Sequence, residues 1–476
     1  MSMRQGLILP IFLLMLLFQG FEVLAQESNY SNYEVGSKAT MLGGSVVAGV
    51  DNISAVYYNP GALSFIENSS VTLETSTMFA GNLQIKNGAG NTIDIKSSFF
   101  DVIPSLIGGV VKNKKSPDWT FAYSSITVNS SFIEFNVRNT MFYDVLAGSA
   151  GEELYEGIYD YTNRIRENWL GASASKKMNE NFGIGLSLFG VYFSQNYNLR
   201  QSANASTVTG DTITNSLAHS SIQRDLRFRS FGFIVKAGAV YKWQNSSLGF
   251  TLTSPMLNID LFAKGDISQT VSVQIPGIVD PSATQNLYGG KLPTFHRTPI
   301  KLSIGYQREW LKSTWNFSVT YNSAVKEYVM VASEPQVFDN PPLTKRAIEA
   351  FDMARQVLNV AIGVRKDIRE GLSFLGGART DLNYSRAGFL DNDKYVPKMS
   401  YWNLYHLTGG VIWSNEKAHL TLGADYAFGL SKGDLQQVNL SDPLESELLF
   451  GIKTTDTRTV HNQIYVVLGF SYSFND

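Results

Sequence analysis

The sequence predicts an all-β protein, a transmembrane antiparallel β-barrel of about 14 strands with a small N-terminal segment plugging its lumen. Three observations support this fold class. The chain has an apolar leader, segments in which every second residue is apolar, and a regular exchange of short turns and long connections. The composition agrees, because charged residues make up only 17% of the chain and aromatic residues 12%. A soluble secreted β protein would share part of this composition, so the organisation of the chain has to decide.

Residues 1–25 have the pattern of a secretory signal peptide. A charged start that ends at Arg4 is followed by an apolar run from Leu7 to Phe18, and Ala25 supplies a small residue for cleavage. The run is short for a membrane anchor, which needs about 20 apolar residues. The chain has no cysteine, which excludes a lipoprotein anchor and a disulfide framework. We therefore expect export and cleavage after Ala25.

The next segment, residues 26–68, does not alternate as a strand does. Small residues dominate it from Val35 to Leu63, and charge is sparse. Such a segment can pack inside a barrel without large side chains to accommodate. A barrel of this size would otherwise leave an open pore, so a plug is physically expected.

From Ser69 to the end, the barrel domain (residues 69–476) alternates apolar and polar or small residues. The last segment is the clearest, with apolar residues at Ile464, Val466, Leu468, Phe470, Tyr472 and Phe474. A period of two directs one face toward lipid and the other toward a polar lumen. The predicted strands are 69–87, 99–112, 118–137, 168–178, 181–202, 220–243, 247–275, 297–310, 313–331, 356–367, 371–385, 400–414, 418–431 and 461–474.

The connections between these strands alternate in length. Short polar turns lie at 113–117, 179–180, 244–246, 311–312, 367–370 and 415–417, and long connections at 138–167, 203–219, 276–296, 332–355, 386–399 and 432–460. Outer-membrane barrels show this asymmetry, with short periplasmic turns and long external loops. The pattern predicts a multi-pass barrel in the outer membrane of a Gram-negative bacterium.

Two of the long connections also contain helical spacing. Leu154, Ile158, Tyr161 and Ile165 follow this spacing, as do Met141, Phe142, Val145 and Leu146. In the second connection, Thr344 could cap a helix that carries Ile348 and Phe351. We therefore expect short helices that cover one mouth of the barrel.

Several classes of function are disfavoured. The formal net charge is −2, so no broad attraction to nucleic acid is implied. The five histidines stand in no recognisable catalytic motif, and the sequence contains no His-Glu-x-x-His. We expect no catalytic residue, no metal site and no cofactor.

The segment before the first strand carries a family resemblance. The residues concerned are Gly36, Lys38, Ala39, Gly43, Gly44, Ala48, Asp51, Asn52 and then Asn59-Pro60-Gly61-Ala62-Leu63. They resemble the N-terminal hatch of the FadL/TodX family of outer-membrane transporters, which carry an Asn-Pro-Ala motif where this chain has Asn-Pro-Gly-Ala. The recognisable sequence covers residues 34–65. The resemblance implies hatch roles for Gly36, Gly43, Gly44, Asp51, Asn59 and Pro60.

The resemblance also implies a function. Members take up hydrophobic small molecules, such as long-chain fatty acids, passively through a hatch-plugged barrel, and they act as monomers. The partners expected are the substrate, outer-membrane lipid and lipopolysaccharide, and the barrel assembly machinery, which would read Tyr472 and Phe474. Two alternatives stay open, a general porin and a surface adhesion or structural barrel. Either would need a different role for the N-terminal segment.

Candidate substrate-binding residues follow from the parity of the strands. Family members meet a fatty-acid carboxylate with lumenal basic residues, and a buried carboxylate needs such a partner. The inward-facing candidates here are Lys236, Lys301, Arg365 and Arg379. The alternative is that they are structural charges paired with groups such as Asp381 or Asp425. Members also release substrate sideways at a kink in the third strand, which here has no Gly or Pro and only a polar break at residues 129–131.

Overall fold

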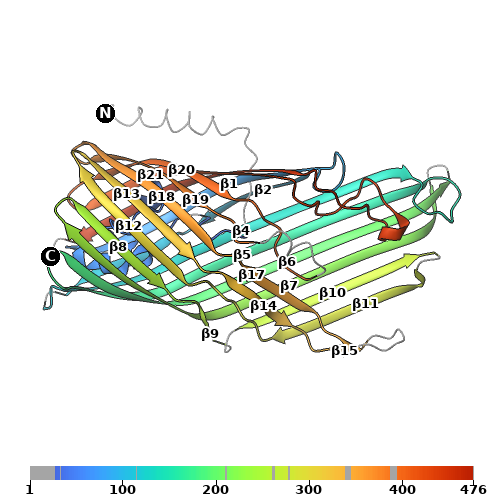
Figure 1. The fold of residues 1–476 in the computed structure, drawn as a ribbon, viewed down its shortest axis with the longest axis horizontal. Helices are drawn as coiled ribbons and strands as arrows, with labels where there is room; N and C mark the ends of the chain where they lie inside the picture. Colours follow the sequence, from blue (N-terminus) through green and yellow to red (C-terminus); the bar gives the residue numbers. More distant parts are fainter. Residues whose placement is uncertain are drawn as a thin grey trace, which may run out of the picture.

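The computed structural model describes residues 27–32, 34–113, 115–209, 212–259, 263–276, 279–337, 345–385 and 394–474. The predicted leader lies outside these ranges. Within them the chain forms a closed antiparallel barrel with 14 strands in its wall (Figure 1). The predicted fold class and strand number are therefore confirmed.

Neighbouring wall strands pair in chain order. The wall consists of β1 (Ser69–Lys86), β2 (Ile95–Ile103) with β3 (Leu106–Lys112), β4 (Trp119–Tyr143), β5 (Glu153–Lys177), β6 (Phe182–Thr209), β7 (Thr212–Trp243), β8 (Ser246–Thr253), β12 (Lys301–Trp310), β13 (Ser313–Asn322), β18 (Val357–Arg369), β19 (Leu372–Asp381), β20 (Leu404–Ser414), β21 (Ala418–Lys432) and β22 (Arg458–Phe474). The last strand closes the ring on the first, from Ser69 opposite Phe474 to Lys86 opposite Arg458.

The wall presents an apolar outer surface and a polar inner one. On β6, Leu186 and Leu188 are 52% and 49% exposed, whereas Ser187 between them is fully buried. The same alternation leaves large apolar side chains exposed on other strands, including Phe121, Leu248, Phe250, Ile304, Phe317, Ile362, Leu407, Leu422 and Phe470. A continuous apolar band of this size is unfavourable in water and is the surface that a bilayer covers. No helix in the described ranges is both long enough and apolar enough to cross a bilayer.

The two ends of the barrel differ, as the connection lengths predict. The short turns gather at the end where β22 finishes, and β4 to β7 run far past their neighbours toward the other end (Figure 1). Strand β7 has 32 residues, which at about 3.3 Å per residue is near 100 Å. This is far more than the ~30 Å hydrocarbon core of a bilayer, so these strands continue into solvent.

The predicted helices in the long connections are wrong. Residues 154–165 belong to β5, which pairs with β6 along its whole length, and residues 141–143 belong to β4. In the other connection, β17 (Glu349–Ala354) pairs with β14 (Val325–Ala332). The confusion has a simple cause: residues four apart, such as Tyr161 and Ile165, share one face in a strand as well as in a helix.

Two predicted strands are interrupted, each at a proline. The segment 99–112 divides into β2 and β3 at Pro104, and both halves pair with β1. The segment 247–275 divides after Ser254-Pro255 into β8, β9 (Leu257–Asn258) and β10 (Lys264–Ile275). Proline has no N–H to give to a ladder, so a wall strand tolerates it only at such a break.

Beyond the second break, part of a predicted loop is also a strand. Strand β10 forms a hairpin with β11 (Val279–Leu292), which covers most of the predicted connection 276–296. A further small ladder joins β15 (Gln336–Val337) to β16 (Lys345–Arg346). These elements and the β14–β17 hairpin lie at the long-loop end of the barrel (Figure 1).

Candidate functional site

The segment from residue 27 to 68, called the N-terminal segment below, is bound by the inner face of the wall. It contains α2 (Ser37–Met41), α3 (Ala55–Tyr58) and the 3-10 helix η1 (Pro60–Phe65). Wall hydroxyl groups donate to its backbone carbonyls, Ser187 to Val56 at 2.9 Å, Thr251 to Tyr58 at 2.8 Å, Ser247 to Ala48 at 3.0 Å and Thr408 to Met41 at 2.9 Å. These donors come from β6, β8 and β20, so the segment contacts well-separated parts of the ring.

Wall glycines allow the N-terminal segment to approach the strands closely. A Cβ atom at Gly249 would lie 2.2 Å from the carbonyl oxygen of Val47, and one at Gly363 would lie 2.5 Å from that of Leu42. Real Cβ atoms do not approach backbone this closely. These small inward residues therefore leave the room that the N-terminal segment occupies.

The glycines of the resemblance motif have a local structural reason. Gly36, Gly43 and Gly44 adopt φ angles of 90°, 62° and 73°, which other residues rarely adopt. Beside them, the Lys38 ammonium lies 2.5 Å from an Asp51 carboxylate oxygen. Together these residues turn and tie the segment within itself.

Asn59 and Pro60 connect the N-terminal segment to the wall. The Asn59 side-chain oxygen accepts from the Gly61 N–H at 3.1 Å, and Pro60 occupies the start of η1. The Asn59 amide donates to the carbonyl oxygens of Val47 at 2.8 Å and of Ala239, on β7, at 3.0 Å. Every polar position of this side chain is thus used, which is more than a simple turn requires.

Arg379 is enclosed in a buried ionic cluster. Its guanidinium lies 3.0 Å from a Glu34 carboxylate oxygen and 2.9 Å from an Asp425 oxygen, with His406 at 2.7 Å. Tyr58 donates to the other Glu34 oxygen at 2.6 Å. The cluster links the N-terminal segment to β19, β20 and β21, in line with the alternative role of a paired structural charge.

Arg365 lies apart from the other candidates. It pairs with Asp367 at 3.0 Å beside the short turn between β18 and β19, and both side chains are substantially exposed. The structure therefore does not bring the four predicted cations together. Lys236 and Lys301 line two cavities in common, and Arg379 borders only the second of these.

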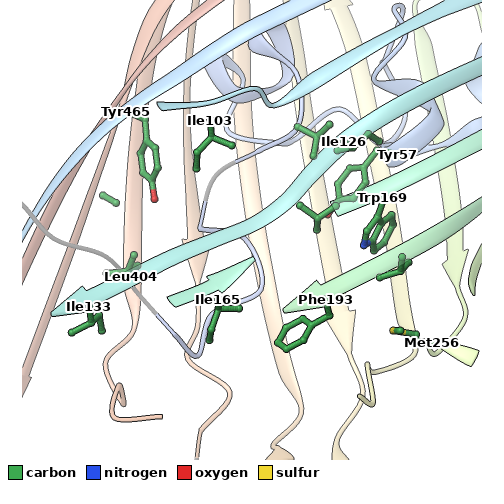
Figure 2. Packing of buried hydrophobic residues seen from close by; sticks show 14 of the residues in the cluster. Tyr57, Ile103, Ile126, Ile133, Ile165, Trp169, Phe193, Met256, Leu404 and Tyr465 are labelled. Atoms are coloured by element: carbon green, nitrogen blue, oxygen red, sulfur yellow. The ribbon is translucent and has the colours of Figure 1, made fainter. Parts of the chain in front are cut away.

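The first cavity lies between the N-terminal segment, the wall and the connections at the long-loop end. Together with the solvent at its mouth it encloses about 910 Å³. Its apolar lining includes Tyr57, Ile165, Trp169 and Phe193, which converge in Figure 2. The imidazole of His296 stacks on the Phe193 ring with centroids 3.9 Å apart. Charged side chains share the lining of this chamber with these rings and aliphatic groups, among them Glu167, Asp352 and Lys398.

Two ammonium groups border this aromatic chamber. Lys236 is 4% exposed, and its nitrogen lies 4.0 Å from the centroid of the Tyr57 ring and 5.9 Å from that of Trp169. The Lys301 nitrogen lies 5.8 Å from the Tyr30 ring centroid. Among the described residues, neither lysine has a carboxylate oxygen within 4.0 Å. Cation–π contacts replace only part of the hydration that a buried ammonium loses.

A second cavity meets the first at the same two lysines. Tyr57, Lys236 and Lys301 line both, and the second continues past Ser303, Ser318 and Thr320 toward Arg379. Its lining is mainly hydroxyls, amides and charges. The two lysines thus stand where the partly apolar chamber meets a polar cavity, an arrangement that can bind an amphipathic anion.

The chamber also reaches an interruption in the wall. Strand β3 pairs with β4 from Lys112 opposite Thr120 only as far as Leu106 opposite Ile126. Past Pro104 no ladder joins β2 to β4 within the described residues, although the Ser97 hydroxyl accepts from the Glu134 N–H at 3.1 Å. A bulge in β4 separates Thr127 from Asn129, and Val128 and Asn129 line the chamber.

No family model matches the chain, and no curated protein matches it. Solved structures do. The toluene transporter TodX of Pseudomonas putida superposes with a TM-score of 0.60 at 15% identity over 93% of this chain and 99% of its own. A Pseudomonas aeruginosa FadL homologue superposes with a TM-score of 0.57 at 14% identity, over 96% of this chain and 100% of its own. The Ralstonia pickettii toluene transporter TbuX superposes with a TM-score of 0.56 at 12% identity, over 93% of this chain and 99% of its own.

The chain has the FadL/TodX barrel fold. At these identities the likeness concerns the course of the backbone, and it extends over nearly the whole chain. It therefore confirms the barrel fold that the resemblance implied. The side chains of this FadL/TodX-type barrel have to be judged from their own geometry.

Sequence reasoning missed most of the residues that shape the chamber. Trp169 and Phe193 lie on predicted strands, but their parity carried no sign of a ligand site. Tyr57 stands in the motif without having been singled out, and His296 comes from a connection. Pro104 was the one available clue to the wall interruption, because proline inside an alternating segment marks a break.

Proposed function

We propose that the protein is an outer-membrane transporter for the passive uptake of hydrophobic small molecules with an anionic head, such as long-chain fatty acids. One observation carries the proposal: a chamber with aromatic and aliphatic lining ends at two ammonium groups that have no carboxylate oxygen within 4.0 Å among the described residues. The similar solved structures are toluene transporters and a FadL homologue, which supports a hydrophobic substrate.

The preference for an anion follows from the cost of burying an unpaired cation. Lys236 faces two rings, and the attraction of a ring for an ammonium is smaller than that of a carboxylate. A ligand carboxylate between Lys236 and Lys301 would offset their lost hydration, while its tail would fill the space beside Trp169 and Phe193. The aromatic lining also suits an uncharged aromatic molecule, but such a molecule would make no ionic interaction with the two lysines.

The proposed route begins at the long-loop end, enters the chamber and leaves through the wall. The ladder between β2 and β4 is missing near Val128 and Asn129, which line the chamber, so a hydrophobic tail would pass there into the bilayer without crossing the polar cavity. The N-terminal segment acts as a hatch that blocks the direct path along the barrel axis. No energy source beyond the concentration gradient is required.

A general porin is the main rival within transport. Its lumen would conduct ions continuously, whereas a barrel plugged by the N-terminal segment would not. Single-channel recording in a planar bilayer separates the two, since a steady large conductance would favour the porin.

A surface adhesion barrel would instead lose partner binding, with uptake intact, when its external connections are shortened. We also propose that the protein works as a monomer and does not act as an enzyme.

The test of the proposal replaces the two lysines together. In Lys236→Met with Lys301→Met, we expect oleate binding to the purified protein to weaken about tenfold or more, since a charge-assisted hydrogen bond contributes about 1.5–3 kcal/mol. Binding of toluene should change little. The control is Lys417→Met, in an exposed short turn.

Binding can be measured by titration calorimetry in detergent, and uptake in cells that lack other transporters of this kind. The proposal fails if wild-type protein binds neither oleate nor toluene. A hydrophobic substrate without an anionic head is indicated if the double variant binds oleate as wild type does.

A further inference from the structure

The carboxylate of Glu27 accepts hydrogen bonds from donors that all lie outside the N-terminal segment. One oxygen accepts from the Tyr161 hydroxyl at 2.5 Å and from the Asn163 amide at 2.6 Å. The other accepts from the backbone N–H of Met399 at 2.6 Å. Glu27 is 1% exposed. We call Tyr161, Asn163 and the Met399 N–H the carboxylate cradle.

The cradle is positioned by the barrel. The Asn163 side-chain oxygen accepts from Gln195 on β6 at 3.1 Å, and both of these amides also donate to the carbonyl oxygen of Pro397, at 3.0 and 2.7 Å. The Tyr161 ring stacks on Phe135 with centroids 5.2 Å apart. The donors would therefore keep their positions if Glu27 left.

Glu27, which occupies the cradle, also borders the chamber already described. Glu27 lines that chamber together with Ile165 and Lys398, and the same chamber extends to Lys236 and Lys301. Lys398 pairs with Asp352 at 2.7 Å and stands near the Glu27 carboxylate. A carboxylate in the cradle thus lies at the border of the chamber, near the apolar side chain of Ile165.

Keeping Glu27 in this place has an electrostatic cost. Burial raises the pKa of the Glu27 carboxyl above its usual value, although the hydrogen bonds from the cradle and the charge of Lys398 oppose that effect. Cleavage after Ala25, as the sequence predicts, would make Glu27 the second residue of the mature chain. The carbonyl oxygens of Glu27 and Ser28 accept from the hydroxyl and the backbone N–H of Tyr384 at 3.2 and 3.0 Å, and the Asn29 amide donates to the carbonyl oxygen of Asp381 at 2.6 Å. Glu27 therefore leaves the cradle if its side chain turns away or if the bonds to Tyr384 break.

We propose that the carboxylate cradle is a binding site for the carboxylate of the transported amphiphile, and that Glu27 is a tethered competitor which the ligand displaces. This inference rests on the proposed function, because it takes the substrate to be an amphipathic carboxylate. It adds a second headgroup position to the chamber, apart from Lys236 and Lys301. Glu27 reduces the apparent affinity for a carboxylate at this position by occupying it.

The experiment compares two probes on the full mature protein in detergent. Oleate carries the carboxylate, and oleyl alcohol has the same tail without it. In Glu27→Ala we expect the apparent affinity for oleate to rise at least threefold and that for oleyl alcohol to stay the same. Glu27→Gln keeps the shape and loses the charge, so it should lie between Glu27→Ala and wild type. Glu156→Gln, on the exposed part of β5, is the matched control and should leave both affinities unchanged.

A second substitution assigns any gain to the cradle. Adding Asn163→Ala to Glu27→Ala should remove the gain for oleate, because the vacated site loses one of its donors. Heat-modifiable mobility on gels and circular dichroism verify that each variant is folded, and Glu27→Gln serves if Glu27→Ala is not.

Two outcomes would overturn the inference. One is an oleate affinity that stays the same or falls when Glu27 is replaced, which would make Glu27 a structural anchor. The other is an equal gain for oleate and oleyl alcohol, which would mean that the chamber has merely widened. Both leave the proposed function intact, whereas wild-type protein that binds neither probe would remove the proposed function itself.

Discussion

Lys236 and Arg379 are both basic, inward-facing residues on barrel strands, yet their surroundings give them different roles. Arg379 has Glu34, Asp425 and His406 around it, whereas Lys236 has the rings of Tyr57 and Trp169. Parity along a strand predicts that a side chain points inward. It does not predict what stands opposite, because the partners come from strands and segments far away in sequence. The sequence therefore supplied a candidate set, and the structure separates its members.

The first prediction concerns the buried ionic cluster. Replacing Arg379 by Met should lower the free energy of unfolding by about 3–5 kcal/mol, because Glu34 and Asp425 would be left buried without their cation. Denaturant unfolding in detergent, followed by tryptophan fluorescence, measures this. Arg365→Met removes an exposed pair and should cost less than about 1 kcal/mol. Equal costs for the two variants would contradict the structural role of the cluster.

The strands were predicted more reliably than the breaks that interrupt them. Period-two alternation locates a wall strand, since it reports an apolar face against lipid. The alternation does not show where the pairing between strands breaks. For this reason β2 and β3 were predicted as one strand, and so were β8 and β10. The alternation also does not mark the membrane surface. A sheet that is covered on one side by other parts of the protein alternates in the same way. Strands β5, β6 and β7 are longer than predicted because residues 153–167, 203–209 and 212–219, assigned to long connections, continue the ladders.

At this scale the wall glycines make a testable prediction. Gly249→Ala should displace part of the N-terminal segment, since its Cβ would lie 2.2 Å from the Val47 carbonyl oxygen. The measurement is single-channel current in a planar bilayer, where the variant should conduct and wild type should not. Gly190→Ala is the matched control, because a Cβ there meets nothing closer than 3.6 Å. If both variants stay closed, the close approach at Gly249 does not hold the plug.

The interruption between β2 and β4 gives the next prediction. Asn129→Trp places a large ring where the chamber meets the break, so oleate uptake into cells should slow several-fold while binding to the purified protein is largely kept. Asn136→Trp, on an exposed part of the same strand, should leave uptake unchanged. Unchanged uptake in Asn129→Trp would argue that substrate leaves by another way.

For the molecule as a whole, the sequence predicted the main features well. The exchange of short and long connections follows from the different environments at the two membrane surfaces, and it survives as the clearest property of the structure. What it could not supply is the architecture above the membrane, where the β10–β11 and β14–β17 hairpins depend on contacts between distant segments. The chamber lies partly under these elements, so its lining was hidden for the same reason.

The direction of the barrel in the membrane can be tested by labelling. The chain contains no cysteine, so single cysteines report their own position. On intact cells a membrane-impermeant maleimide should label Glu152→Cys in the connection between β4 and β5, and should not label Glu416→Cys in a short turn. Permeabilised cells should label both. The reverse pattern would invert the proposed orientation and move the chamber to the periplasmic side.

Closure of β22 on β1 brings together residues as distant along the chain as Ser69 and Phe474. Contacts of such high sequence separation give a high contact order, and folding rates fall as contact order rises. Until the last strand docks, both closing strands present unpaired edges on which other chains can aggregate. Once the ring is sealed, no edge is left from which unzipping can begin. The barrel should therefore be slow to form, dependent on chaperones before insertion, and persistent for kinetic reasons once it is made.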